Sequence, residues 1–180
     1  MELKNIDKTL YRKRLNVVIV SFILGFGISS VLFGTLLISL FAATDVHLVA
    51  DSVAGEGKSN FKLNLIGVVL GLILSTLVLH RLRNHPYFDE IYYVWQIKQI
   101  QNLIYRKLSK IKQSANDGDV NAMIVLNFYF ESLKQIYKLD DNTITLSTVE
   151  KEHQHYQMMF EERNIVISTS QFTKSMLNEF

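Results

Sequence analysis

The feature that most constrains this chain is a long stretch, residues 15–44, that contains no Asp, Glu, Lys or Arg. A second stretch of this kind covers residues 63–80. A helix that crosses a bilayer needs roughly 17–25 predominantly apolar residues, and both stretches meet that requirement. We therefore predict two transmembrane helices, which together form a hairpin in the first half of the chain.

The distribution of charge around these two stretches predicts their orientation. Residues 1–14 hold five Lys or Arg and two acidic residues, and Arg81 and Arg83 follow the second stretch directly. The connecting residues 45–62 hold three acids and two lysines. Because Lys and Arg are retained on the cytoplasmic side, both termini are predicted to be cytoplasmic and residues 45–62 to form an outer loop. Residues 1–14 are expected to form a basic interfacial helix that meets anionic headgroups.

Small residues recur at every fourth position within both apolar stretches. Spacing of this kind lets two helix backbones approach closely, so these positions are predicted to be helix-packing sites in the membrane. The predicted positions are Ser21, Gly25 and Ser29 in the first stretch and Gly67, Gly71 and Ser75 in the second.

Residues 81–163 are predicted to form a cytoplasmic domain of three antiparallel helices, so the whole chain is expected to be all-α. The helices are expected at residues 89–114, at residues 120–138 and from Ser147, where Ser147 and Glu150 have the spacing of a capping box, to about Arg163. Residues 164–180 are expected to be loosely held or to pack as a short final helix. Four residues are predicted to share one core: Ile97, Ile104, Leu126 and Tyr156.

The first of these helices carries a narrow apolar stripe at helical spacing. The stripe consists of Tyr93, Ile97, Ile100, Ile104, Leu108 and Ile111. Such a stripe suits a seam between two helices, and it either closes the domain's own bundle or recruits another helix. The basic residues on the other side of this helix are interpreted as a solvated face. Contact with lipid headgroups is the alternative, and nucleic acid is not expected because no dense basic run is present.

The domain is divided by charge. Residues 81–112 hold seven basic and two acidic residues, whereas residues 113–180 hold five basic and ten acidic residues. An antiparallel return would bring Asp140, Asp141, Glu150 and Glu152 toward the membrane side. We therefore predict that these acids contact the first helix of the domain or residues 1–14, and that the contact is sensitive to salt.

Three further stretches, in their order and spacing, resemble a bacterial family catalogued as domain of unknown function 3087. They are residues 59–68, 92–99 and 139–146. The resemblance implies an inner-membrane protein with two spans, and it brings no activity, ligand or catalytic residue with it.

No stretch of the sequence has the pattern of a catalytic or metal site. His153 and His155 form the one close histidine pair, but on a helix two residues apart means about 200° apart, so we expect one at the core edge and one in solvent. The chain has no cysteine, no Gly-rich phosphate loop and no His-Glu-x-x-His motif. We expect no enzyme activity and no cofactor.

Two functions remain. The first is a membrane-anchored interaction or scaffold module that binds a protein partner or a second copy of itself. The alternative is a small accessory or regulatory subunit of a larger inner-membrane complex, which contacts its partner through the transmembrane helices. Anionic lipids are expected to be partners at the basic N-terminus and at the juxtamembrane helix.

Overall fold

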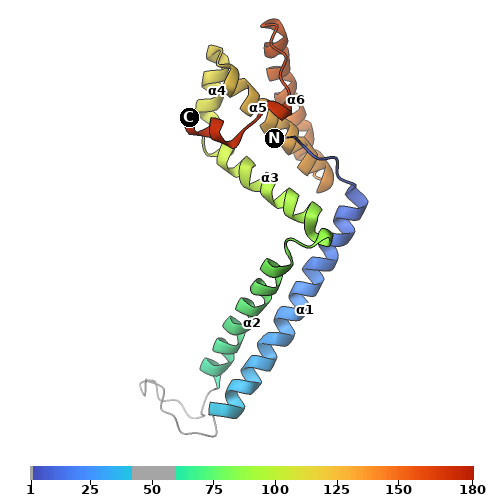
Figure 1. The fold of residues 1–180 in the computed structure, drawn as a ribbon, viewed down its shortest axis with the longest axis vertical. Coiled ribbons are helices and arrows are strands. Elements are labelled where there is room, and N and C mark those ends of the chain that lie inside the picture. Colours follow the sequence, from blue (N-terminus) through green and yellow to red (C-terminus); the bar gives the residue numbers. More distant parts are fainter. Residues whose placement is uncertain (1, 42–59) are drawn as a thin grey trace. The chain divides into compact units, whose positions relative to one another are not determined.

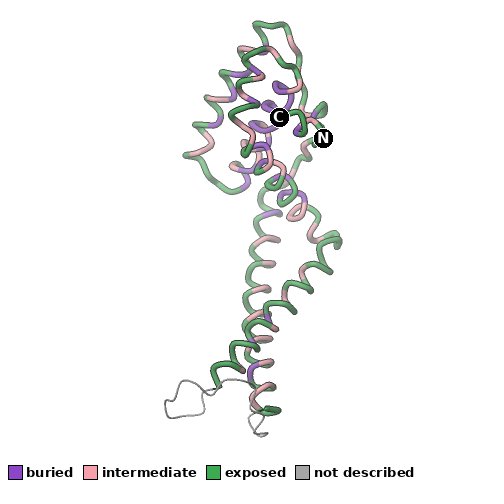
Figure 2. The backbone as a smooth tube through the Cα atoms, turned by 90° about the vertical axis from the view of Figure 1, so that its left-hand side faces the viewer, coloured by how far each residue is buried: buried purple, intermediate pink, exposed green. Residues whose placement is uncertain are grey.

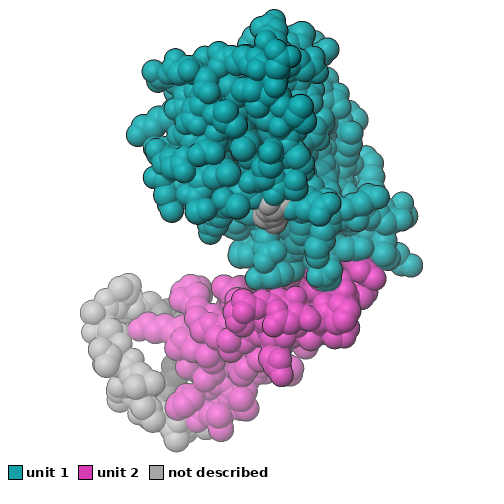
Figure 3. All heavy atoms as spheres, turned by 45° about the horizontal axis from the view of Figure 1, so that its top comes forward, with its two compact units in different colours: residues 1–13, 89–180 teal, residues 14–88 magenta. Residues whose placement is uncertain are grey.

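A computed structural model describes residues 2–41 and 60–180, and every regular element within these ranges is helical (Figure 1). The chain divides into two compact units (Figure 3). One unit, here called the hairpin unit, is Arg14–Phe88; the other, called the helical unit, consists of residues 1–13 and 89–180. The expected all-α class is confirmed.

Two long helices, α1 (Lys8–Phe41) and α2 (Phe61–Leu82), make up most of the hairpin unit. Both are long and apolar enough to cross a membrane, judged by length and composition. Most residues of both helices are exposed or half-buried (Figure 2). Large apolar residues are among the exposed ones; Val31 is 65% exposed and Phe61 is 68% exposed. At 1.5 Å per residue, the 22 residues of α2 extend over about 33 Å, close to the thickness of a bilayer's hydrocarbon core.

The first helix begins earlier than expected. Residues 1–14 were predicted to form a separate short helix, but α1 runs without a break from Lys8 into the apolar stretch. The Asp7 carboxylate accepts a hydrogen bond from the backbone N–H of Leu10 at 2.8 Å, so Asp7 satisfies one of the free donors at this helix start. Most of the predicted outer loop, residues 45–62, lies outside the described residues.

The helical unit is built around α5 (Val120–Leu139), which is buried on most of its circumference. A helix that is apolar all round is typical of a core position. The neighbouring elements are α3 (Asp89–Tyr105), α4 (Leu108–Asp117) and α6 (Thr143–Glu162). All four residues predicted for one core are buried, so that prediction is confirmed: Ile97, Ile104, Leu126 and Tyr156.

The single helix predicted for residues 89–114 is wrong, because the structure has two helices there. The chain turns at Arg106 and Lys107, where the Lys107 N–H bonds to the Ile104 carbonyl at 2.9 Å, three residues back. Ile104 and Ile111 lie on either side of the turn and both are fully buried. The apolar stripe therefore continues through the turn, and the bend keeps both ends of it against the core.

The predicted start of α6 is also wrong. The helix begins at Thr143 rather than near Ser147, and its N-cap is Asn142, whose side-chain oxygen accepts from the Thr145 N–H at 3.2 Å. The Ser147 hydroxyl donates instead to the Ile144 carbonyl within the helix. Asp141 has a φ of 57°, which allows a tight turn between α5 and α6.

Of the two expectations for residues 164–180, a loosely held segment is wrong and packing in short helical form is closer to the structure, because Phe172 and Leu177 are buried. Two short 3₁₀ helices, η2 (Thr169–Gln171) and η3 (Lys174–Glu179), hold this segment. Phe172 is fully buried and its ring stacks on Phe128 with the centroids 4.0 Å apart. The Lys107 ammonium donates to the Leu177 carbonyl at 2.7 Å.

Candidate functional site

The two long helices of the hairpin unit meet where small residues face each other. A Cβ added at Gly67 would lie 2.5 Å from the backbone N of Gly34, and one at Gly71 would lie 2.8 Å from the backbone N of Ser30. Distances this short leave no room for a side chain. Two of the predicted packing residues, Gly67 and Gly71, therefore lie in the crossing, but their partners are Ser30 and Gly34, which the sequence prediction did not include.

The predicted stripe on α1 lies beside this crossing. The Ser29 hydroxyl is 3.5 Å from the Gly71 carbonyl, whereas a Cβ at Gly25 would meet nothing within 4 Å. Two overlapping series of small residues run along α1, one through residues 21, 25 and 29 and one through residues 30 and 34. Because both have the spacing that close packing needs, the spacing alone does not select between them.

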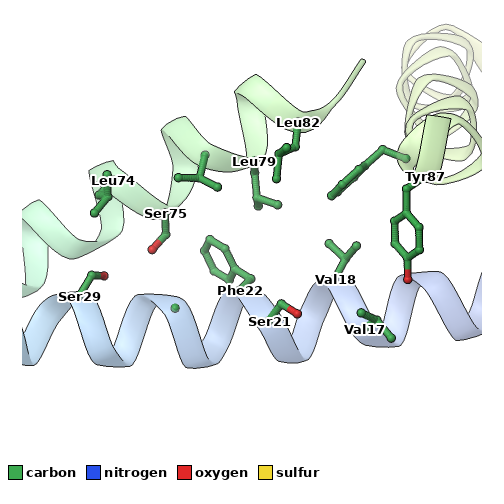
Figure 4. A pocket seen from close by; sticks show the side chains of 13 residues that line it. Val17, Val18, Ser21, Phe22, Ser29, Leu74, Ser75, Leu79, Leu82 and Tyr87 are labelled. Carbon is green, nitrogen blue, oxygen red and sulfur yellow. The ribbon is translucent and has the colours of Figure 1, made fainter. Parts of the chain in front are cut away.

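A groove between the helices occupies the space beside the crossing. It has a volume of about 420 Å³ and lies within the hairpin unit, between the N-terminal half of α1 and the C-terminal half of α2. Figure 4 shows the side chains that line it, with the hydroxyls of Ser21, Ser29 and Ser75 among apolar groups. The complete lining is Val17, Val18, Ser21, Phe22, Gly25, Ser29, Leu74, Ser75, Val78, Leu79, Leu82, Tyr87 and Phe88.

The predicted apolar seam is turned into the helical unit's own core. Tyr93, Ile97, Ile104 and Ile111 are buried. The other two members of the seam, Ile100 and Leu108, are half-buried. Most of the seam is therefore buried within the helical unit, which favours the first of the two alternatives, that it closes the domain's own bundle.

The N-terminal segment, residues 2–13, packs against the rest of the helical unit. Tyr11 is only 2% exposed. The backbone N–H of Lys4 donates to the Tyr93 hydroxyl at 2.8 Å, and the Lys8 ammonium and the Arg12 guanidinium both pair with the Asp141 carboxylate. We call this set of contacts the N-terminal clasp.

The clasp and two further ion pairs confirm the predicted contact between distal acids and basic residues. Lys98 pairs with Asp140 at 2.9 Å, and Lys112 pairs with Glu152. Lys8 and Arg12 belong to the segment that was also expected to meet lipid headgroups, and in the structure both pair with Asp141. Three of the four distal acids named in that prediction thus lie against α1, α3 or α4.

A polar cluster centred on the buried side chains of His153 and Asn127 lies between α5 and α6. The Lys134 ammonium donates to Nδ1 of His153 at 3.3 Å, so Nδ1 is the acceptor. The ring proton of the neutral His153 is therefore on Nε2, which donates to Oδ1 of Asn127 at 3.1 Å. Lys134 also pairs with Glu131 at 3.0 Å. Burial of the ring, together with the charge of Lys134, lowers the pKa of His153.

This cluster has a structural role. His153 is buried and His155 is exposed, as the 200° separation predicted. A neutral His153 satisfies Asn127 inside the core, and its ring stacks on Phe130. Within the described residues no group of three or more His, Asp or Glu has the geometry of a metal site.

Comparison with known proteins identifies one family. A sequence profile described as "Protein of unknown function (DUF3087)" matches residues 1–177. No curated protein and no solved structure shows significant similarity to the chain.

Proposed function

We propose that this chain, which belongs to the family of proteins of unknown function DUF3087, is a membrane-anchored helical interaction module of the bacterial inner membrane. The observation that carries the proposal is the contrast between the two units. Most of the exposed large apolar side chains belong to the hairpin unit, whereas the helical unit buries most of its own. An apolar surface of this extent is costly in water and favourable in lipid.

The N-terminal clasp supports a specific topology. Residues 1–13 precede the first apolar helix and residues 89–180 follow the second, yet both belong to one compact unit. If α1 and α2 each cross the bilayer once, both flanks emerge on the same side, as a shared folded unit requires. The Lys and Arg residues that flank the two helices favour the cytoplasmic side.

An exposed face of α3 is the surface that we propose for a protein partner. Trp95 is 53% exposed and its ring stacks on Tyr92 with the centroids 5.6 Å apart. Gln99 and Asn102 follow Trp95 at helical spacing on α3 and are exposed, and Arg106, in the turn after α3, is exposed as well. Trp and Arg are the residue types most often found at binding hot spots, and the apolar seam on the other face of α3 is already buried.

A pull-down of the detergent-solubilised full-length chain tests this proposal. Trp95→Ala removes the exposed ring and is expected to reduce the yield of a specific partner at least tenfold, in line with the 2 kcal/mol or more typical of hot spots. Lys151→Gln, on the exposed surface of α6, is the matched control. Equal yields of the partner from Trp95→Ala and the parent chain would exclude this face.

The accessory-subunit role is the second candidate, and one observation favours it. The small residues Gly25 and Gly27 on α1 have open space where a side chain would stand. A partner's transmembrane helix would need such a surface. In that case Gly25→Leu would reduce the yield of the partner and Trp95→Ala would leave it unchanged. Gly67 and Gly71 are unsuitable for this test because they lie in the chain's own helix crossing.

A further inference from the structure

The groove between α1 and α2 ends inside the hairpin. One end is closed at Ser29, where α1 and α2 approach each other. Tyr87 lies at the other end (Figure 4), and the next residue, Phe88, also lines the groove. Its volume of about 420 Å³ is within the roughly 300–1,000 Å³ of sites that hold small molecules. Because the groove ends at the crossing, its occupant must end there too. A transmembrane helix, about 10–12 Å wide with its side chains, would have to continue past the crossing, whereas an acyl chain can end inside the groove.

Positive charge gathers at the aromatic end of the groove. The guanidinium of Arg14 lies 5.3 Å from the centre of the Tyr87 ring, which lines the groove. Arg83, the C-cap of α2, has helical backbone angles and follows the groove residue Leu79 by four positions, so it lies on the same face as Leu79; Arg81 is in the last turn of α2, one residue before the groove residue Leu82.

Arg81 and Arg83 have no acidic neighbour among the described residues of the hairpin unit. Residues 14–41 and 60–88, which are the described residues of this unit, contain no Asp or Glu. Arg81 and Arg83 are exposed, and within the part of the chain that the structure describes neither has an ion-pair partner. Asp89 and Glu90 directly follow the groove residue Phe88, but Asp89 pairs with Lys4 and Glu90 has an interaction of its own. The positive charge without an ion-pair partner near the aromatic end of this apolar groove, here called its mouth, is therefore that of Arg81 and Arg83.

We propose that this groove binds one anionic membrane phospholipid. An acyl chain lies between α1 and α2 against Phe22 and Leu79, and the phosphate lies at Arg81 and Arg83. The charge of the mouth matches a phosphate, and the apolar lining matches the chain. This inference rests on the proposed membrane location of α1 and α2, and it deepens that proposal by naming a ligand.

Native mass spectrometry of the full-length chain in detergent tests the inference, with phosphatidylglycerol and phosphatidylcholine added in equal amounts. We expect retained phosphatidylglycerol to exceed phosphatidylcholine. Arg81→Gln and Arg83→Gln should each weaken phosphatidylglycerol binding about fivefold, because one basic side chain near an anionic headgroup contributes about that factor. Lys151→Gln, far from the hairpin in sequence, is the control for loss of one charge.

Two substitutions fill the groove without touching the arginines. Gly25→Leu adds a side chain at a lining position where a Cβ meets nothing within 4 Å. Ser75→Leu places a larger side chain in the groove from the facing helix. Both are expected to abolish retention of phosphatidylglycerol. Gly27→Leu is the matched control, since Gly27 is equally open but does not line the groove.

Three results would overturn the inference. The first is equal retention of the two lipids, and the second is unchanged retention in both groove-filling variants. The third is a lipid-free dimer, which would assign the groove to a second copy of the chain. Flotation of the same preparations with phosphatidylglycerol vesicles separates this inference from the proposed function. A chain that floats but retains no lipid contradicts only the inference, and a chain that does not float contradicts both.

Discussion

The N-terminal clasp has two components, and their energies are expected to differ. Asp141→Asn removes the carboxylate that pairs with Lys8 and Arg12, and Tyr11→Ala removes a buried ring. The Lys8, Arg12 and Asp141 side chains are each close to half-exposed, so solvent screens both pairs. At about 0–1 kcal/mol per exposed pair, Asp141→Asn should cost about 2 kcal/mol at most.

Tyr11→Ala should cost more, because truncation of a large buried aromatic side chain costs about 3–5 kcal/mol. Each kcal/mol corresponds to about 4–8 °C in the melting temperature of a domain of roughly 60–100 residues. Thermal melting of the full-length chain in detergent measures both variants at low salt and at about 0.5 M salt. The higher concentration shortens the screening length well below its low-salt value.

The two variants should also differ in their response to salt. The difference between Asp141→Asn and the parent chain should shrink in high salt, since ions screen exposed pairs. The effect of Tyr11→Ala should be the same at both salt concentrations, because burial of an apolar ring does not depend on screening. If Tyr11→Ala has the same melting temperature as the parent chain, residues 2–13 are not part of the helical unit. The argument that both flanks of the hairpin lie on the same side of the membrane then fails.

Three further predictions concern packing and pH. Gly71→Leu should separate α1 from α2, because the added side chain meets the Ser30 backbone. The yield of disulfide cross-linking between cysteines placed on the two helices should therefore fall. Gly27→Leu is the control and should leave the cross-linking yield unchanged. Burial lowers the pKa of His153 in the folded chain, so His153 is protonated in the unfolded chain at a higher pH than in the folded one. The helical unit should therefore lose stability as the pH falls below about 6.5. His153→Gln should remove this pH dependence in a chemical denaturation series, and His155→Gln should retain it. Phe172→Ala should lower the melting temperature by the equivalent of about 3–5 kcal/mol, and a change below about 1 kcal/mol would mean that the C-terminal segment is not part of the core.

Periodicity was sufficient to predict much of the helical unit. The spacing of Ile97, Ile104 and Leu126 placed them in one core, because apolar residues on one helix face must be buried together. The opposite charges of the two halves of the domain also predicted where Asp140 and Asp141 would find partners. These patterns act over several turns, so a single unusual residue does not obscure them.

The errors arose where local signals compete. The stripe through Ile104 and Ile111 is continuous in sequence, so it gives no sign of the turn at Lys107, which tertiary packing imposes. Asn142 and Ser147 are both good N-cap residues, and only the tight turn at Asp141 selects Asn142.

The groove was not predictable for a related reason. Its existence depends on which of two series of small residues on α1 meets α2, and both series have the same spacing. The structure places the crossing at Ser30 and Gly34, which leaves Ser21 and Gly25 to line a cavity.

The side of the membrane on which each segment lies tests the central claim most directly. The chain has no cysteine, so single cysteines can be introduced without removing any. Asn5→Cys and Asn178→Cys lie at exposed positions before and after the two apolar helices, and Gly55→Cys lies in the predicted outer loop. In intact spheroplasts, a membrane-impermeant thiol reagent is expected to label Gly55→Cys alone, and detergent should make the other two reactive. Labelling of Asn5→Cys or Asn178→Cys without detergent would contradict a two-span anchor with both ends in the cytoplasm.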